Sequence, residues 1–327
     1  MPILLFLSEM AETEEIPTPK TKKQVFWDVV KTILKIGFTS LLLYLVLRKM
    51  DFEKVKSTLS ASNPLYLLLA VLTFFLSQLV ASSRLLSFFK SINLRLSFVF
   101  NLRLYMLGLF YNLFLPGGIG GDGYKIWLLN KSYKLPAKRV FWAIFFDRLS
   151  GLWAIGLIIV ALIGFLPQIQ IHLAIPLSVF VVGTAAYCFV AKHFFKDYTH
   201  FFFEAHAKAI LVQSMQVITV LFVLLALHFN GKFSPYLFTF LAASLSAIVP
   251  FSVGGLGLRE YIFVHFAPFF NMDPNLAVVV SLLFYLTSAV VSLLGIYYVF
   301  NTKRLNEGLP KPEETENLPD KNSITQS

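Results

Sequence analysis

The chain has 327 residues, of which 57% are hydrophobic and only 14% are charged. Soluble domains carry about 25% charged residues, so this composition excludes a soluble enzyme, a disordered chain and a nucleic-acid-binding domain. The formal net charge of +10 comes from 28 Lys and Arg against 18 Asp and Glu. In so apolar a chain we interpret this excess as basic cytoplasmic loops. The sequence therefore predicts an all-α polytopic membrane protein.

Polar segments flank one long apolar region. We expect residues 1–27 to form a cytoplasmic polar tail, 28–300 a single membrane domain, and 301–327 a disordered cytoplasmic tail. Within the membrane domain, the apolar runs predict about six full spans and two helical hairpins, eight or so membrane segments in all. The expected full spans are 28–47, 65–86, 140–164, 172–191, 208–229 and 275–300.

Each expected hairpin has a tip rich in proline and glycine. Its first arm ends at Pro116 or Pro250, and a glycine cluster follows before the chain becomes apolar again. Proline cannot continue a helix interior and glycine reaches conformations that other residues avoid, so the backbone breaks there. A broken backbone at membrane depth has to be buried in protein or line a wet cavity, so we expect two re-entrant helical hairpins. The expected arms are 97–115 and 124–129, then 235–249 and 258–270.

The two glycine clusters align with each other. Residues 116–125 and 250–259, which are 134 positions apart, share a proline, a β-branched aliphatic, a Gly-Gly pair, a further glycine and a final basic residue. The same offset brings the span after the first hairpin onto the last span, so the membrane domain divides into halves of about 28–164 and 172–300. The halves begin on opposite sides of the membrane. This pattern predicts an inverted-topology repeat, in which transport sites form at the bilayer midplane.

Basic residues in the loops orient the expected spans. Lys and Arg gather in 125–139 and 192–208, whereas 165–171 carries no charge, so we expect the first two stretches inside and the third outside. Both termini are then cytoplasmic, and we expect a multi-pass protein of the bacterial cytoplasmic membrane. The loop 48–56 is an exception, because its four basic residues would be external. Further basic residues that favour the inside are Arg84, Lys90, Arg95, Lys303 and Arg304.

The helix that restarts after each glycine cluster points its N-terminus at the hairpin tip. Free N–H groups and a partial positive charge at such an end favour an anion. Lys125 and Arg259 lie in the first turns of these helices and add full positive charges. Two such ends facing each other would suit a phosphate-bearing headgroup; the alternative is that the glycines only allow close helix packing. The glycines considered for the site are Gly120, Gly121, Gly254 and Gly255.

Two adjacent charges, Asp147 and Arg148, interrupt the expected span 140–164. They lie roughly 12 Å from its cytoplasmic end, where an ionisable residue is costly and usually functional; an internal salt bridge is the alternative. Adjacent residues point about 100° apart on a helix, so each needs a partner elsewhere. Asp122 is either a helix cap or a site residue, and Glu260 either serves the helix dipole or belongs to the site. The candidate partners of the two charges are Arg103, Lys125, Arg259 and Glu260.

Three segments resemble, in order and spacing, the transmembrane region of lysylphosphatidylglycerol synthetases, a flippase-like family. They are Asn112–Asp122, Asp147–Leu152 and Pro250–Glu260, and the resemblance covers roughly residues 28–300. In the bifunctional members this region moves aminoacylated phosphatidylglycerol between leaflets, and a soluble C-terminal domain makes that lipid. Residues 301–327 are too few for such a domain, so we expect a stand-alone member. The resemblance implies lipid translocation.

We therefore expect an integral membrane lipid translocase without its own ATPase, which moves a phospholipid or another phosphate-bearing lipid between leaflets. The headgroup would enter a polar cavity between the hairpin tips while the acyl chains stay in the bilayer. Asp147 and Glu260 would favour a cationic or hydroxyl-bearing part of the headgroup, and the basic residues the phosphate. The candidate headgroup-binding residues are Arg103, Gly120, Gly121, Asp122, Lys125, Asp147, Arg148, Gly254, Gly255, Arg259 and Glu260.

Two alternative functions stay open. The first is a membrane-embedded transferase acting on lipid-linked sugars, and the second is a non-catalytic accessory subunit of another lipid enzyme. The six histidines show no metal-ligand spacing with acids, and Cys188 is the single cysteine, so we expect no metal, no cofactor and no catalytic constellation. The expected partners are membrane lipids, either an anionic or zwitterionic phospholipid or a polyprenyl-phosphate lipid, and no nucleic acid.

Overall fold

The computed structural model describes residues 57, 60–114, 120–246, 258–301 and 304–305. All regular structure in these ranges is helical, which confirms the all-α fold class. The helices are α4 (Pro64–Ser91), α5 (Phe98–Phe114), α6 (Gly120–Tyr133), α7 (Ala137–Ile163), α8 (Ala174–Phe194), the 3₁₀-helix η1 (Lys196–Tyr198), α9 (Phe202–Ala226), α10 (Ser234–Ser246), α11 (Leu258–Phe269), α12 (Pro274–Leu293) and α13 (Ile296–Phe300).

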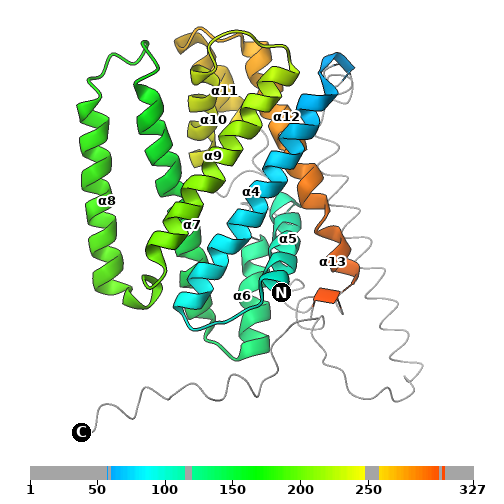
Figure 1. Ribbon diagram of the computed structural model, residues 1–327, viewed down its shortest axis with the longest axis vertical. Helices are drawn as coiled ribbons and strands as arrows, with labels where there is room; N and C mark the ends of the chain where they lie inside the picture. Colours follow the sequence, from blue (N-terminus) through cyan, green and yellow to red (C-terminus); the bar gives the residue numbers. More distant parts are fainter. Residues whose placement is uncertain (1–56, 58–59, 115–119, 247–257, 302–303, 306–327) are drawn as a thin grey trace.

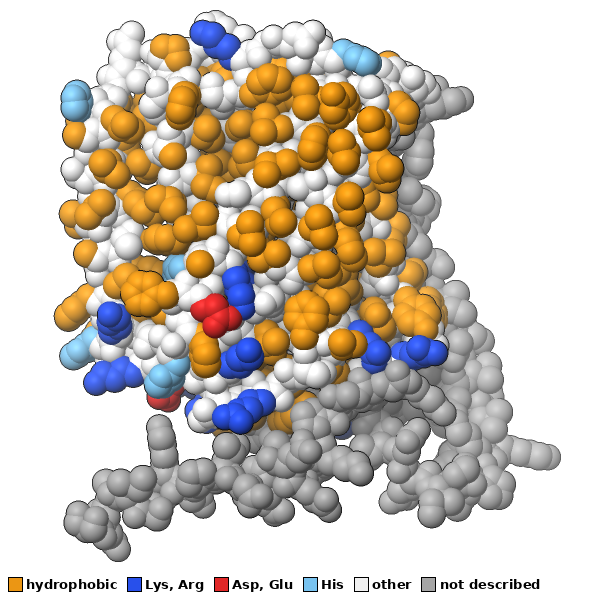
Figure 2. All heavy atoms as spheres, viewed as in Figure 1, with side chains coloured by type: hydrophobic (Ala, Val, Ile, Leu, Met, Phe, Trp, Pro, Cys, Tyr) orange, Lys and Arg blue, Asp and Glu red, His pale blue; other side chains and the backbone are white. Residues whose placement is uncertain are grey.

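Five helical segments in the described part of the chain are long and apolar enough to cross a membrane: α4, α7, α8, α9, and α12 continued by α13. They correspond to five of the expected spans, while the expected span 28–47 lies outside the described residues. Their outer surfaces remain apolar, and hydrophobic side chains cover the middle of the face in Figure 2. A surface of this kind is stable against lipid tails rather than water. The protein is therefore a polytopic membrane protein.

Two of the spans begin with the same local signal. Asn63 caps α4 by accepting a hydrogen bond from the Leu65 N–H at 3.0 Å, and Asp273 caps α12 in the same way. A proline follows each cap at the first helical position. Proline has no N–H group, and the N–H of this position has no partner within a helix. The Asn63 N–H also donates to the carbonyl of Ala226 at 2.8 Å, so the start of α4 is joined to the end of α9.

The short helices form two antiparallel pairs at opposite ends of the bundle (Figure 1). The α5–α6 pair lies at the end where α4 stops and α7 starts, and the α10–α11 pair at the end where α9 stops and α12 starts. Each pair therefore begins and ends at one end of the bundle. The expected hairpin tips fall in 115–119 and 247–257, so the tips, with Gly254 and Gly255, lie outside the described residues.

The helix order of the first half returns in the second half with reversed direction. The series α4, α5–α6, α7 corresponds to α9, α10–α11, α12, and α4 runs antiparallel to α9 (Figure 1). These two central helices pack against each other more extensively than any other described pair. The arrangement is the one that an inverted repeat predicts. Helix α8 stands at the side of the bundle against α7. The counterpart expected for it, the span 28–47, lies outside the described residues.

Charge is distributed unequally between the two ends of the bundle. Lys and Arg side chains gather at the end shown at the bottom of Figure 2, where α6 connects to α7 and α8 to α9. The connection 164–173 at the opposite end contains no Lys or Arg. The two basic stretches expected on one side of the membrane therefore do lie at one end.

The arms of the first hairpin touch through glycine. A Cβ atom added to Gly121 on α6 would lie 2.0 Å from the carbonyl oxygen of Gly108 on α5, so no side chain fits between the two backbones. Gly121 thus has a packing role, as in the alternative considered from the sequence. Gly123, two residues further along α6, faces open space, with nothing within 4 Å of an added Cβ.

We expect Gly121→Ala to separate α5 from α6 and to lower the unfolding free energy by about 1–3 kcal/mol, because the added methyl group overlaps backbone. Gly123→Ala is the matched control and should leave stability unchanged or raise it by up to about 1 kcal/mol, since alanine favours a helix. Thermal unfolding of both variants in detergent measures the difference. Equal melting temperatures would contradict the close contact between the two arms.

Candidate functional site

A buried ion pair joins α4 to α7. The Nε and Nη2 groups of Arg84 donate to the two carboxylate oxygens of Asp147 at 2.8 and 3.0 Å. The side chains are only 8% and 9% exposed. Such a bidentate Arg–carboxylate pair is among the strongest hydrogen-bond geometries in proteins. The partner of Asp147 is therefore Arg84, which sequence reasoning had grouped with the basic residues of the cytoplasmic side and not with the four candidate partners.

The segment after Asp147 is shaped to receive this guanidinium. A Cβ atom on Gly151, one turn further along α7, would lie 3.1 Å from an Nη atom of Arg84. A Cβ atom there would crowd the guanidinium, which would have to shift by a few tenths of an ångström. The hydroxyl of Ser150 donates to the backbone carbonyl of Asp147 at 2.7 Å and so turns its own polar group inward along the helix. The stretch 147–151, part of the segment that carries the family resemblance, thus holds Arg84 by charge and by shape.

A second ion-paired group lies on the next residue of α7. Arg148 donates through Nε to the carboxylate of Asp122, which also accepts from the Lys125 ammonium at 3.1 Å. Asp122 and Lys125 stand in the first turns of α6 and are buried, whereas the Arg148 side chain is 42% exposed. This second group therefore joins the α5–α6 hairpin to α7.

Tyr105 on α5 links the two groups. Its ring lies 4.6 Å from the Lys125 ammonium, a cation–π contact. The phenol is also close enough to interact electrostatically with both acids and both arginines of the two ion pairs. We define the charge cluster by these six side chains: Arg84, Tyr105, Asp122, Lys125, Asp147 and Arg148. It contains three basic and two acidic groups, so it carries one net positive charge.

The start of α6 is already occupied by protein groups. The side-chain oxygen of Asn112 accepts a hydrogen bond from the Gly121 N–H at 2.8 Å, and Asp122 places a negative charge in the first turn. Sequence reasoning expected free N–H groups here and quoted Asn112 only for the resemblance. The sequence signal for this contact was Asn112 itself, an amide side chain eight positions before the start of α6. It satisfies one helix N–H and ties the two arms together.

The charged residues of the second hairpin make different contacts. The Arg259 guanidinium lies over the rings of Phe284 on α12 and Phe240 on α10, at 4.8 and 5.5 Å. Glu260 accepts a hydrogen bond from the hydroxyl of Ser281 on α12 at 2.9 Å. Within the described ranges, no hydrogen bond or ion pair connects Arg259 to the charge cluster. Whether Arg259 and Lys125 share one phosphate therefore stays a prediction.

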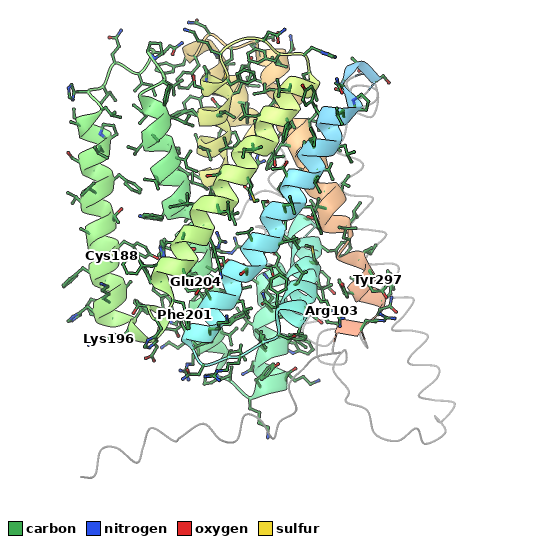
Figure 3. All side chains as sticks on the ribbon, viewed as in Figure 1. Arg103, Cys188, Lys196, Phe201, Glu204 and Tyr297 are labelled. Carbon is green, nitrogen blue, oxygen red and sulfur yellow. The ribbon has the colours of Figure 1, made fainter. Side chains whose placement is uncertain are left out.

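Arg103 contacts the C-terminal part of the membrane domain. Its Nη1 donates to the backbone carbonyl of Arg304, where α5 meets α13 and the residues after it. Figure 3 shows Arg103 toward the basic end of the bundle, near Tyr297. This position gives the residue a role in joining α5 to the C-terminal part of the membrane domain.

Sequence reasoning missed one further ion pair, on the outer side of α4 and α9. Lys208 pairs with Glu204 one turn earlier on α9, and its ammonium donates to the Ser87 hydroxyl at 2.9 Å. Ser87 in turn donates to the Glu204 carboxylate at 3.0 Å. Glu204 is visible between α9 and α4 in Figure 3. Sequence reasoning counted Lys208 among the loop charges, because the expected span began at residue 208, whereas α9 begins at Phe202.

Comparison with known proteins gives one finding on ancestry. The family model described as the lysylphosphatidylglycerol synthase TM region matches residues 32–295. The match covers every described helix from α4 through α12, with the charge cluster and both short-helix pairs. Among curated proteins, no similar chain is found. The resemblance seen in three short segments thus extends over most of the chain.

We expect Asp147→Asn and Arg84→Met each to destabilise the protein by about 3–5 kcal/mol, because each leaves a buried group without its partner. The double variant should lose less than the sum of the two, with a coupling of about 0.5–3 kcal/mol. Thermal unfolding in detergent is the measurement.

The matched control is a second double-mutant cycle, built from Glu204→Gln and Lys208→Met. It removes an ion pair that is partly exposed, so each single change should cost no more than about 1 kcal/mol. If the two cycles gave the same small losses, the Arg84–Asp147 pair would not hold α4 against α7.

Proposed function

We propose that this chain, which belongs to the lysylphosphatidylglycerol synthase TM region family, is a lipid translocase that moves a phosphate-bearing lipid between the leaflets of its membrane. Family membership makes it a membrane protein related to lipids. The translocase function is our inference from the charge cluster. Within the described ranges, no group of three or more His, Cys, Asp or Glu could hold a metal ion.

The observation that carries the proposal is the position of the charge cluster inside an apolar bundle. Five ionised side chains contributed by three helices meet there, although ionisable residues within the membrane are costly and are kept mainly for function. The six side chains that define the cluster include three basic and two acidic groups. A local excess of basic groups attracts an anion, and phosphate is the anion that every phospholipid headgroup contains.

The two ion pairs support different parts of the proposed mechanism. The fully buried Arg84–Asp147 pair holds α4 and α7 together as a fixed frame. The Asp122–Arg148 pair connects this frame to the α5–α6 hairpin and is the more exposed of the two. A headgroup phosphate presents the same kind of acceptor as the Asp122 carboxylate, so it can replace that carboxylate at Arg148. Binding would then release the hairpin from α7.

The second hairpin supplies the matching element at the opposite end. If α10–α11 opens as α5–α6 closes, the headgroup site is reached from one leaflet at a time, which is the rocking motion of inverted-repeat transporters. The acyl chains stay in the bilayer against the apolar outer surface. Arg259 and Glu260 would receive the headgroup on this side, although the contacts described for them are with α10 and α12.

We further propose that the basic end of the bundle faces the cytoplasm, with both chain termini on that side, in the cytoplasmic membrane of a bacterium. The support is the gathering of Lys and Arg at one end and their absence from 164–173. Basic residues near short loops set orientation in this sense.

Translocation is tested with fluorescent phospholipids in proteoliposomes. We expect Arg148→Gln to slow the initial rate at least tenfold, because a charge-assisted hydrogen bond to phosphate contributes about 1.5–3 kcal/mol. Arg103→Gln removes the same charge from the α5–α13 contact and should keep more than half of the rate. Equal rates in wild type and Arg148→Gln would contradict a role of the cluster in transport. Turnover of a labelled lipid-linked sugar without translocation would favour the transferase alternative.

Orientation is tested with single cysteines in a Cys188→Ala background. Lys134→Cys lies in the connection at the basic end and Gln168→Cys in the uncharged connection. In intact cells an impermeant maleimide should label only the cysteine at 168. Labelling at 134 alone would reverse the proposed orientation, and the rate of the unlabelled variants in the transport assay is the control for folding.

A further inference from the structure

The basic end of the bundle carries a groove that the headgroup site does not use. It lies between the start of α7 and η1 and has a volume of about 370 Å³. A second depression of about 300 Å³ continues it along the end of α8. We call the two together the α7–η1 groove. Its lining includes Lys138, Arg139, Trp142, Lys196, Asp197 and Tyr198.

The groove is basic. Lys138, Arg139 and Lys196 line it, and none of the three forms an ion pair within the described part of the chain. Asp197 is the single acidic residue of the lining, so the groove carries two net positive charges. Figure 3 places Lys196 at the basic end, below α8. This charge balance favours an anionic ligand.

Aromatic side chains give the groove a fixed wall. Trp142 packs against Phe195 with ring centroids 4.7 Å apart, and Tyr198 stacks on Phe146 at 5.5 Å. The Tyr198 hydroxyl donates to the Arg139 carbonyl at 3.3 Å. Burial raises the pKa of this phenol. Trp and Tyr prefer the level of the lipid headgroups, so the wall marks the membrane interface.

The surface next to the groove is apolar and faces outward. Phe141 and Phe145 on α7 and Phe194 on α8 are 47%, 41% and 68% exposed. An inorganic anion or an acidic peptide would leave these rings in contact with lipid tails and gain nothing from them. A ligand with a charged head and apolar chains uses both surfaces at once.

We propose that the α7–η1 groove binds the headgroup of an anionic diacyl phospholipid, with its phosphate among Lys138, Arg139 and Lys196 and its acyl chains on the adjacent phenylalanines. This is a second lipid site, and it does not rest on the translocase function. It lies on the same helix as the charge cluster, with Arg139 eight residues before Asp147, roughly 12 Å along α7. Phe146, which packs on Tyr198, directly precedes Asp147, so the wall of the groove is joined to the helix segment that carries the cluster.

The test uses Trp142 as a reporter within the groove. Full-length protein is reconstituted with phospholipids brominated in the acyl chains, either phosphatidylglycerol or phosphatidylcholine, and tryptophan quenching is compared. The signal of Trp142 is the difference between wild type and Trp142→Phe. We expect at least a tenfold preference of this signal for the anionic lipid.

The triple variant Lys138→Gln, Arg139→Gln, Lys196→Gln should reduce the preference to less than threefold. The matched control is Lys90→Gln, Arg95→Gln, Lys134→Gln, which removes the same charges from the same end outside the groove and should keep the preference. An equal loss in both triple variants, or no preference in wild type, would overturn the proposal. Relief of quenching by millimolar inorganic phosphate would overturn it too, because the occupant would then be a soluble anion.

Discussion

The buried pairing of Arg84 with Asp147 is the interaction on which the rest of the membrane domain depends. A glycine at 151 leaves room for the guanidinium, and the pair fixes α4 against α7 with a charge-neutral contact. Because α7 is then fixed in rotation, the next residue, Arg148, is presented to the start of α6. The position of the α5–α6 hairpin thus follows from an ion pair in which it takes no part.

The same constraint separates what is rigid from what can move. Apolar contacts between helices in lipid have little hydrophobic driving force, so close packing and polar pairs decide which helices stay together. Within the hairpin, the Gly108–Gly121 contact and the Asn112 hydrogen bond join α5 to α6 as one body. Between the hairpin and α7, the ion pair is partly exposed. A motion of the hairpin as a unit is therefore easier than a change within it.

The sequence predicted the helices well and their polar partners poorly. Apolar runs bounded by Pro, Asn and Asp place α4, α7 and α12 within a few residues, because length and composition suffice for a membrane span. The pairing of Asp147 with Arg84 could not be found, since Arg84 stands near the basic end of its helix and looked like an interfacial charge. Gly121 was assigned to anion binding because glycine looks the same in a sequence whether it serves packing or a ligand. The packing role became visible only from the close approach of the Gly121 and Gly108 backbones in the structure.

The position of Arg84 has a consequence for biosynthesis. It is made 63 residues before its carboxylate partner, so α4 is synthesised before the acid with which its arginine pairs in the folded protein. Its place in the last two turns of α4 lets the long side chain reach up to the lipid phosphates while α7 is still being translated. Once α7 is inserted, Asp147 supplies the partner that this guanidinium keeps in the folded protein.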